Sequence, residues 1–409
     1  MDYFQRVNDV FWSPSFWLPQ NVTWEAFEKF ESKDGLRMPS IQDVYFAWKL
    51  IPLVLFVKYF MEKCIAATFA KWLGVKEEPR EKPPSVDILE KEHRANPWGK
   101  WSHEKILALS KELAWTEIQV KSWLKDRRRF ALPTTAEKFS ESSWRSCVFF
   151  FIFTYGLIVH WSKEWLWDIK LCAQGYPQPV TDDIYWYFII SLANYSAWNF
   201  SHFWDVPRRD PKVVITHHFS AVVLLSGMWV AGAHRVGLLV CLTHDVGDIL
   251  LEACKCSKYL NLLKAKAWWL WIFAFFNCGI WIVTRNIILP LHIIPSIYHY
   301  SPFNLPQTFP LSCFHGSCNI SAFKFTMCHV LLIMLVGMSI LHVYWTCIMV
   351  RISYLGLIVG KMEDDTRSIS NCDNDDDEDN HEKELNWTER TAPPKNNRNW
   401  LHCNINRRP

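Results

Sequence analysis

The sequence predicts an all-α polytopic membrane protein with about seven transmembrane helices and a small cytosolic helical insert. Half of its 409 residues are hydrophobic, with 24 tryptophans and 27 phenylalanines. The apolar residues form runs long enough for a bilayer span of ~20 residues, whereas segments 76–138 and 361–409 are charged and polar. The runs lack the alternating pattern of membrane β-strands, which disfavours a β-barrel.

The candidate spans are apolar runs separated by polar loops. They cover roughly residues 41–62, 143–161, 184–203, 212–231, 236–252, 267–289 and 326–350. The third and fifth runs are polar enough to be the weakest candidates. The N-terminus lacks a basic stretch followed by an apolar core, so we expect no cleavable signal peptide and a first span that stays as an anchor.

Basic residues in the loops predict the orientation in the membrane. Lys and Arg gather after the first span, between the third and fourth, after the fifth and after the seventh. Because cytosolic loops are enriched in these residues, we expect these four loops to lie in the cytosol. The N-terminus is then lumenal and the C-terminus cytosolic.

Two lumenal segments carry candidate modification sites. Asn21 begins a glycosylation sequon in the N-terminal segment, and Asn319 begins another in the loop before the last span. Cys313 and Cys318 share that loop, where a disulfide between them can form. The other cysteines lie mostly in spans or cytosolic segments, where we expect reduced thiols.

Five ionisable residues interrupt two neighbouring apolar runs: His217, His218, His244, Asp245 and Asp248. A charged group within a span costs ~2.5–3.5 kcal/mol on insertion scales, so a group of five calls for a functional explanation. His244 and Asp248 are four residues apart and Asp245 and Asp248 are three apart, so each pair shares a helix face.

The connection between these two runs predicts that the five residues meet. Residues 231–233 form a short turn, so the two helices are antiparallel. His217 lies about 22 Å before the turn and His244 about 18 Å after it, at ~1.5 Å per residue. We therefore expect one polar cluster inside the bundle, nearer its cytosolic end.

Three chemistries can use such a cluster. A histidine can act as base or nucleophile with an aspartate orienting its ring. Histidines and aspartates can hold a metal, although a single HH pair is fewer than membrane di-iron enzymes carry, and we expect no metal. The cluster can also form the ion pathway of a transporter. Other histidines near or within the spans are interpreted as packing residues: His160, His202, His292, His329 and His342.

The cytosolic segment 100–129 has apolar residues at helical spacing and predicts two short helices. Its end, QVKSWLKDRRR, resembles the recognition helix of a homeodomain. Asp126 stands where homeodomains carry an adenine-reading asparagine, and the first span leaves no room for the first helix and arm. We therefore expect no DNA binding, and expect Arg127, Arg128 and Arg129 to face lipid headgroups or anionic ligands.

The two apolar runs that contain the five ionisable residues together resemble a motif of a known family. ITHHFSAVVLL followed by HRVGLLVCLTHDVGDILLEACK resembles the Lag1 motif of ceramide synthases, which belong to the TLC-domain family. LPQNVTW, KFSESSWRS, VTRNIILP, LHVYWTCIMVRI and KMEDDTRS also resemble family segments in the expected order. Pro207 and Pro211 depart from the pattern, and segment 291–323 is longer than usual, so acyl-chain preference is not carried over.

The resemblance implies a domain order. It gives a lumenal segment 1–40, a first transmembrane helix 41–63, a cytosolic linker with a truncated homeobox-like region 64–138, a TLC domain 139–355 and a disordered acidic cytosolic tail 356–409. It also implies an enzyme of the endoplasmic reticulum membrane that forms homo- or heterodimers.

The activity implied is N-acylation of a sphingoid base by a fatty acyl-CoA, with acyl-CoA as co-substrate and no other cofactor. We expect a covalent acyl group on His217 and polarisation of its ring by Asp248. His218, His244 and Asp245 then shape the site or move protons. Direct transfer, with a histidine as general base for the amine, is the rival mechanism.

Four basic residues near the cytosolic ends of the spans are expected to contact the anionic coenzyme A. They are Arg145, Arg208, Arg209 and Lys212. Ordinary anchoring at the cytosolic face is the alternative for each of them. The alternative for the whole chain is a non-enzymatic TLC-type lipid sensor or a translocon-associated membrane protein.

Overall fold

The computed structural model of the chain divides into two compact units. It describes residues 2–30, 35–75, 80, 82–97, 99, 101–172, 174–208, 210–260, 275–303, 325–355 and 358. The first unit, here called the bundle, contains residues 1–76 and 135–365, and the second contains 77–134 together with 366–409. Predictions about Arg209, Asn319, Cys313, Cys318 and most of the tail 356–409 lie outside the described residues.

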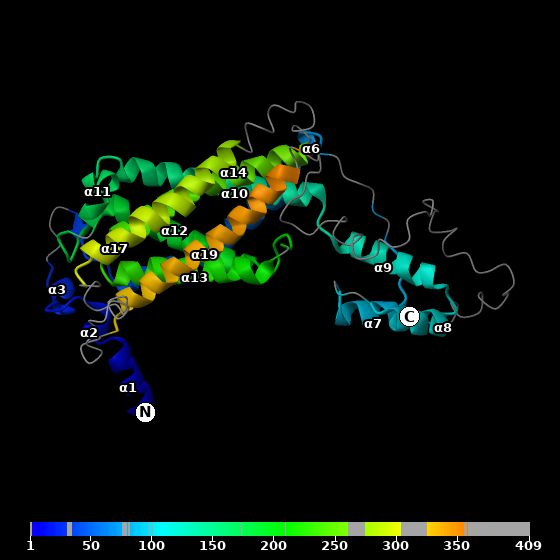
Figure 1. Cartoon of the computed structure of the whole chain (residues 1–409), viewed down its shortest axis with the longest axis horizontal. Coiled ribbons are helices and arrows are strands. Elements are labelled where there is room, and N and C mark those ends of the chain that lie inside the picture. Colours follow the sequence, from blue (N-terminus) through cyan, green and yellow to red (C-terminus); the bar gives the residue numbers. More distant parts are fainter. Residues whose placement is uncertain are drawn as a thin grey trace. The chain divides into compact units, whose positions relative to one another are not determined.

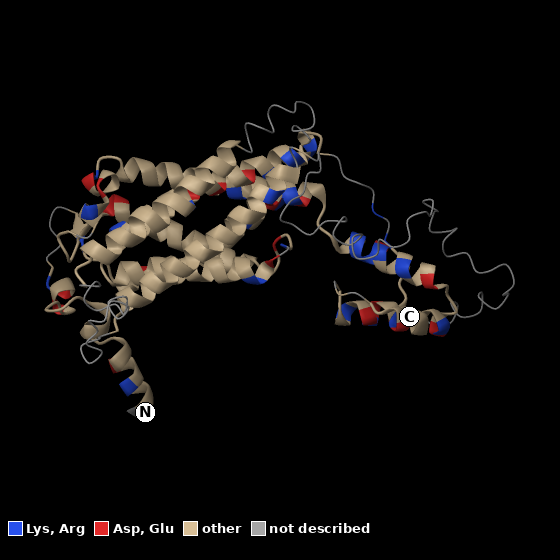
Figure 2. Ribbon diagram, in the orientation of Figure 1, with Lys and Arg blue, Asp and Glu red and all other residues tan. Residues whose placement is uncertain are grey.

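The bundle is built from long helices that run side by side (Figure 1). They are α10 (Thr135–His160), α12 (Asp182–Ser201), α13 (Pro211–Val230), α14 (His234–Tyr259) and α19 (Met327–Tyr354), together with the π-helix η3 (Ile282–Ile293), which continues into the short helix α17 (Ile294–Tyr300). Helix α10 packs along α14, and α13 contacts α12, α14 and α19. These helices are mostly uncharged along their length, and charged residues gather toward their ends (Figure 2).

Short elements surround the long helices. They are α1 (Asp2–Phe11), α2 (Pro14–Trp17), α3 (Glu25–Glu28), α4 (Ile41–Lys49), α5 (Ile51–Phe60), η1 (Met61–Ala66), α6 (Ala67–Trp72), α11 (Glu164–Trp167) and η2 (Ile169–Cys172). The described strands are β1 (Leu36–Arg37) and β2 (Val180–Thr181), which pair antiparallel. The predicted first span is therefore helical but is divided among α4, α5 and η1.

Aromatic and small side chains hold the bundle together. Phe188 of α12 stacks on Trp229 of α13, with ring centroids 3.7 Å apart. Gly156 of α10 lies so close to α12 that a Cβ there would come within 2.6 Å of Tyr187. Close helix approach through a small residue is common in membrane bundles, where packing replaces the hydrophobic effect as the driving force.

Among the described residues, four helical stretches are long and apolar enough to cross a bilayer: Glu117–His160, Pro211–Val230, Phe275–Tyr300 and Met327–Tyr354. The class of all-α membrane protein is thus confirmed, whereas the count of seven spans is not. Helices α12 and α14 are 20 and 26 residues long but are not among the four. These helices form the two predicted spans that carry the most polar residues.

The described part of the second unit, here called the insert, has its own small core. The insert consists of α7 (Asp87–Ala95), α8 (His103–Leu113) and α9 (Glu117–Ala131). Helices α8 and α9 are the two that the spacing of apolar residues in segment 100–129 predicts. Ser102 caps α8, and a Thr116–Gln119 capping box begins α9. Leu89, Val120 and Trp123 are fully buried between the three helices.

The basic cluster of α9 is engaged within the insert. Arg128 is 4% exposed and donates to the carbonyl oxygens of Pro97 and Gly99. Arg127 pairs with Glu90 at 2.8 Å. The prediction that all three arginines face anionic partners is therefore wrong for Arg128, because its guanidinium satisfies buried backbone carbonyls instead.

Candidate functional site

Helices α10, α12, α13, α14 and α19 and the π-helix η3 line a cavity in the bundle. Its polar lining residues are Tyr195, His217, His218, His244 and Asp248. The rest of the lining is largely apolar and includes Phe149, Leu224, Met228, Leu289, Leu335 and Met338. The cavity volume is about 70 Å³, more than the ~10–15 Å³ that one water requires, so it has room for part of a larger molecule.

The adjacent histidines of α13 face different neighbours. The ring of His217 lies 5.0 Å from Trp345 and 5.6 Å from His342, both on α19. The ring of His218 lies 6.2 Å from Trp198 on α12. Successive residues point about 100° apart on an α-helix, which explains why both line one cavity from different sides. Nε2 of His217 and Nδ1 of His218 are buried without a hydrogen-bond partner among the described residues.

Helix α14 supplies three of the predicted residues, and the structure separates their roles. Nδ1 of His244 lies 2.7 Å from the carbonyl oxygen of Val240, so this nitrogen carries the proton and donates. His244 and Asp248 both line the cavity, as their spacing predicts. Asp245 is fully buried against α12, where Tyr195 donates to its carboxylate at 2.5 Å.

Asp248 has a partner that the sequence reasoning missed. Its carboxylate lies 2.6 Å from the guanidinium of Arg285, which also donates to the carbonyl oxygen of His244 at 3.0 Å. Arg285 is 2% exposed, and its guanidinium stacks 3.8 Å over the ring of Trp281. It lies in the π-helix η3, a form that occurs often at functional sites. The sequence signal that could have identified this residue is a charged arginine within the apolar run 267–289.

His342 is the second residue that the sequence reasoning missed. It was interpreted as a packing residue, but its Nε2 lies 3.3 Å from Nε2 of His244. It is fully buried on α19, three residues before Trp345. Trp345 in turn donates to Asp210 at 3.0 Å, which joins α19 to the start of α13. Only the packing of α19 against α13 and α14 reveals this histidine, because nearly a hundred residues separate it from His244.

Three imidazoles therefore converge from three helices. Ring nitrogens of His217, His244 and His342 all lie within 4.8 Å of one another, a grouping that can hold a divalent cation. Arg285 is paired with Asp248, so its charge does not exclude a cation there. The same three rings, when neutral, can also pass a proton among themselves.

Arg145 and Arg208, predicted to contact an anionic substrate, lie in a buried ion-pair network. Arg145 pairs with Asp205 at 2.9 Å and with Glu141 at 3.1 Å. Arg208 also pairs with Glu141, at 2.8 Å. Lys58 approaches Asp205 from α5, at 2.6 Å. The network ties the loop before α13 to α5 and α10, which positions the helix that carries the histidines.

The electrostatics of Asp205 reflect this pairing. Burial alone would raise its pKa, but the positive charges of Arg145 and Lys58 outweigh burial and hold its pKa below the usual range. Lys212 is different, because it is exposed at the first turn of α13. Of the predicted basic residues that the structure describes, it is thus the one that a soluble anion can reach most readily. Asn21, the predicted glycosylation site, is exposed between α2 and α3.

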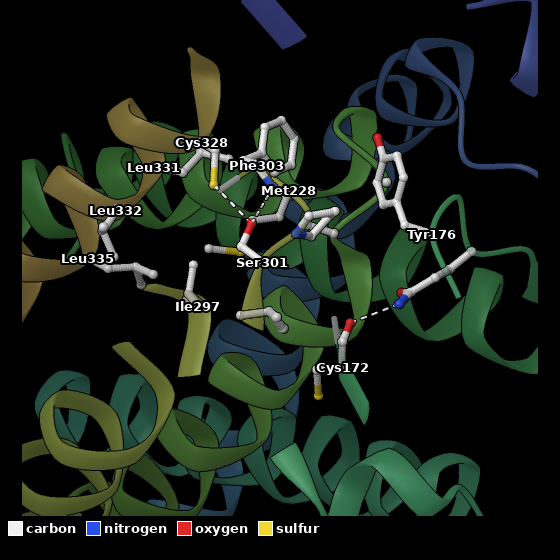
Figure 3. Close-up of a pocket in the computed structure, with 15 residues that line it drawn as sticks. Cys172, Tyr176, Met228, Ile297, Ser301, Phe303, Cys328, Leu331, Leu332 and Leu335 are labelled. Carbon is white, nitrogen blue, oxygen red and sulfur yellow. Dashed lines mark hydrogen bonds between the residues drawn. The ribbon is translucent and has the colours of Figure 1, made fainter. Parts of the chain in front are cut away.

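The structure also contains a second, apolar cavity (Figure 3). Its volume is about 50 Å³, and its walls include Cys172, Tyr176, Ile297, Phe303, Cys328 and Leu332. Met228 of α13 and Leu335 of α19 line both cavities. The two side chains therefore mark the boundary between the histidine-lined space and a more apolar one toward η2 and α17.

The sequence matches known proteins over most of its length. Residues 138–351 match the TLC domain. The chain is 31% identical to human ceramide synthase 4 over 362 residues, which are 88% of this chain and 86% of that protein. It is 33% identical to mouse ceramide synthase 5, over 87% of this chain and 81% of the relative. It is 29% identical to ceramide synthase hyl-1 of Caenorhabditis elegans, over 87% and 82%.

Proposed function

This chain belongs to the TLC-domain family, among the ceramide synthases, and from that premise we propose that it transfers a fatty acyl group from acyl-CoA to the amino group of a sphingoid base. The product is a ceramide or dihydroceramide. The observation that carries the proposal is the pair His217 and His218 on the wall of a buried, mainly apolar cavity. Acyl-CoA supplies the acyl group, so the reaction needs no resident cofactor.

His217 is the proposed nucleophile. Its Nε2 is buried beside the cavity with no hydrogen-bond partner among the described residues, so its lone pair is available. Attack on the thioester carbonyl forms a C–N bond, breaks the C–S bond and releases the coenzyme A thiolate. The sphingoid amine then attacks the acyl-imidazolium, and the imidazole leaves as a neutral ring. The amide forms when the attacking nitrogen loses a proton to a nearby base.

The contacts of Asp248 change the role expected for it. Its carboxylate pairs with Arg285, so we propose that it compensates this buried cation instead of polarising His217 directly. The pair also holds the backbone of α14, because Arg285 donates to the carbonyl oxygen of His244. Asp248 therefore acts on the site through Arg285 and α14, and Asp245 through its bond with Tyr195.

The two cavities, of about 70 and 50 Å³, have room for part of a long apolar chain. The acyl chain of the proposed intermediate extends from His217 past Met228 and Leu335 into the second cavity. Burying each methylene contributes ~0.8 kcal/mol, so a fatty chain gains much of its binding energy along this path. The more polar first cavity would then hold the carbonyl carbon and the amine.

Access from the cytosol agrees with the distribution of charge. We propose a multi-pass protein of the endoplasmic reticulum membrane with a lumenal N-terminus and a cytosolic C-terminus. Lys212 lies on the first turn of the helix that carries His217, so a phosphate of coenzyme A can bind there while the thioester enters the bundle. Arg145 and Arg208 support the entrance through their ion pairs and do not contact substrate.

Mass spectrometry of the purified full-length protein tests the proposal. Incubation with acyl-CoA alone is expected to add one acyl group to His217, and later addition of sphinganine is expected to remove it and give the N-acyl product. His217→Ala should show neither event. A protein that turns over without an adduct on His217 would support direct transfer. One that makes no N-acyl product from any acyl-CoA and sphingoid base would support a non-enzymatic lipid-binding role.

A further inference from the structure

We propose that His342 and His244 act as one proton-accepting pair for the second half of the reaction, in which the amine takes the acyl group. The inference deepens the proposed function and rests on it. His342 offers the unprotonated ring nitrogen that takes the proton, and His244, which lines the cavity, shares the added charge through the bond between the rings.

The hydrogen bonds assign the protons of the pair. Nδ1 of His244 faces the carbonyl oxygen of Val240 at 2.7 Å, and a carbonyl oxygen only accepts, so this nitrogen carries a proton. Nε2 of neutral His244 is then an acceptor. Because Nε2 of His342 lies 3.3 Å away, the bond between the rings requires the proton of neutral His342 to be on its Nε2.

This assignment leaves a bare nitrogen in the interior. Nδ1 of His342 is buried and has no hydrogen-bond partner among the described residues. An unpaired acceptor in an apolar interior is unfavourable, and its lone pair is open to a proton. His160, outside the site, also has one ring nitrogen without a hydrogen-bond partner among the described residues, so it is the position of His342 beside His217 that sets it apart.

The pair is also in the right place. The ring of His342 lies 4.8 Å from the ring of His244 and 5.6 Å from that of His217. The amine that attacks an acyl group on His217 must therefore release its proton within reach of the ring of His342. The incoming proton binds the bare Nδ1 of His342, and the proton on Nε2 of His342 can pass along the bond to Nε2 of His244, so the two rings share a single added charge.

The balance of the step needs no further reactant. The nitrogen of the amine forms the C–N bond, the bond from the acyl carbon to Nε2 of His217 breaks, and the imidazole keeps the electron pair. One proton passes from the nitrogen to the pair and then to the coenzyme A thiolate released earlier. Because Asp248 compensates Arg285, the added charge on the pair is the only uncompensated one among these described groups.

The test separates the two half-reactions in full-length purified protein. In His342→Gln, acyl transfer from acyl-CoA to His217 is expected to stay within about threefold of wild type, whereas transfer to sphinganine falls ~10²–10⁴-fold, the usual contribution of a general base. Acyl-enzyme therefore accumulates. Glutamine keeps a donor that can orient His244, so full activity in this variant would reduce His342 to an orienting group and overturn the proposal.

Two further measurements keep the result interpretable. His160→Gln removes an equally buried histidine outside the site and should leave the ratio of the two half-reactions unchanged. In His342→Ala, added imidazole should restore the second half-reaction, which a merely structural loss would not permit. Loss of both half-reactions in a folded His342→Gln, or a stoichiometric divalent metal in wild type that is lost in this variant, would also overturn the proposal. Absence of any adduct in wild type would instead contradict the acyl-histidine function.

Discussion

Two buried polar groups lie near the start of α13, and they differ in how their members are paired. In the ion-pair network, Lys58, Glu141, Arg145, Asp205 and Arg208 each face an opposite charge within 3.1 Å. In the histidine cluster, several ring nitrogens lack a hydrogen-bond partner among the described residues. Both groups are costly to bury, but only the network is compensated internally.

The difference teaches how to assign roles to buried polar residues. A network whose charges are balanced stabilises one arrangement of the chain, and a substrate gains little by competing with its short ion pairs. Unpaired nitrogens beside a cavity can form new bonds without first breaking old ones. We therefore assign structure to the network and chemistry to the cluster, although the sequence placed arginines of the network among the substrate contacts.

The largest effect on the reaction rate is expected from substitutions in the histidine cluster. His217→Ala should lower the rate of N-acylation by about a thousandfold or more, since the covalent route is lost. His218 faces α12, so His218→Ala should lower the rate only about tenfold to a hundredfold, because the reacting groups are then held less accurately. Initial rates of product formation by purified, folded variants measure both. A larger loss for His218→Ala would transfer the nucleophile to that residue.

Substitutions in the ion-pair network should mainly lower the stability of the fold. Glu141→Gln removes a buried negative charge that pairs with both Arg145 and Arg208 and should destabilise the fold by ~3–5 kcal/mol. Thermal unfolding in detergent measures this loss of stability. The matched control is Asp182→Asn, which breaks the exposed pair Arg37–Asp182 and should lower the free energy of unfolding by only ~0–1 kcal/mol. A stable Glu141→Gln protein with a strongly raised KM for acyl-CoA would return the arginines to substrate binding.

The boundary between the cavities should set how long a chain fits. Met228→Trp fills the passage, so products with long acyl chains should fall about tenfold relative to short ones, because part of the apolar burial is lost. Val336→Trp is the control, since Val336 is 44% exposed on the same helix as Leu335. Competition between long and short acyl-CoA substrates gives the ratio. An unchanged ratio in Met228→Trp would show that the acyl chain takes another path.

The smallest effect is expected at the surface. Lys212→Ala should raise the KM for acyl-CoA about two- to fivefold with little change in kcat, since an exposed ion pair contributes ~0.2–1 kcal/mol. The effect should shrink as salt increases, because exposed charges are screened. Lys29→Ala is the control: it removes an exposed lysine far from Lys212 in the sequence and should leave both KM and kcat unchanged. A drop in kcat for Lys212→Ala would point to a role in positioning α13.

Helical periodicity and a short turn predicted much of the site from the sequence. The spacing of His244 and Asp248 placed them on one face, and both line the cavity with His217. The same spacing also grouped Asp245 with them, but Asp245 turns to Tyr195. Periodicity describes a helix by itself, and which neighbour each face meets depends on how the helices pack.

The sequence by itself determined the helical membrane class, the family segments and the residues of two adjacent helices that line the polar cavity. Local spacing suffices for these, because they depend on contacts within a helix or across one turn. Only the tertiary structure decided that His342 meets His244 and that Arg285 pairs with Asp248. These contacts join helices distant in the chain, and the long-range packing that creates them leaves no local pattern.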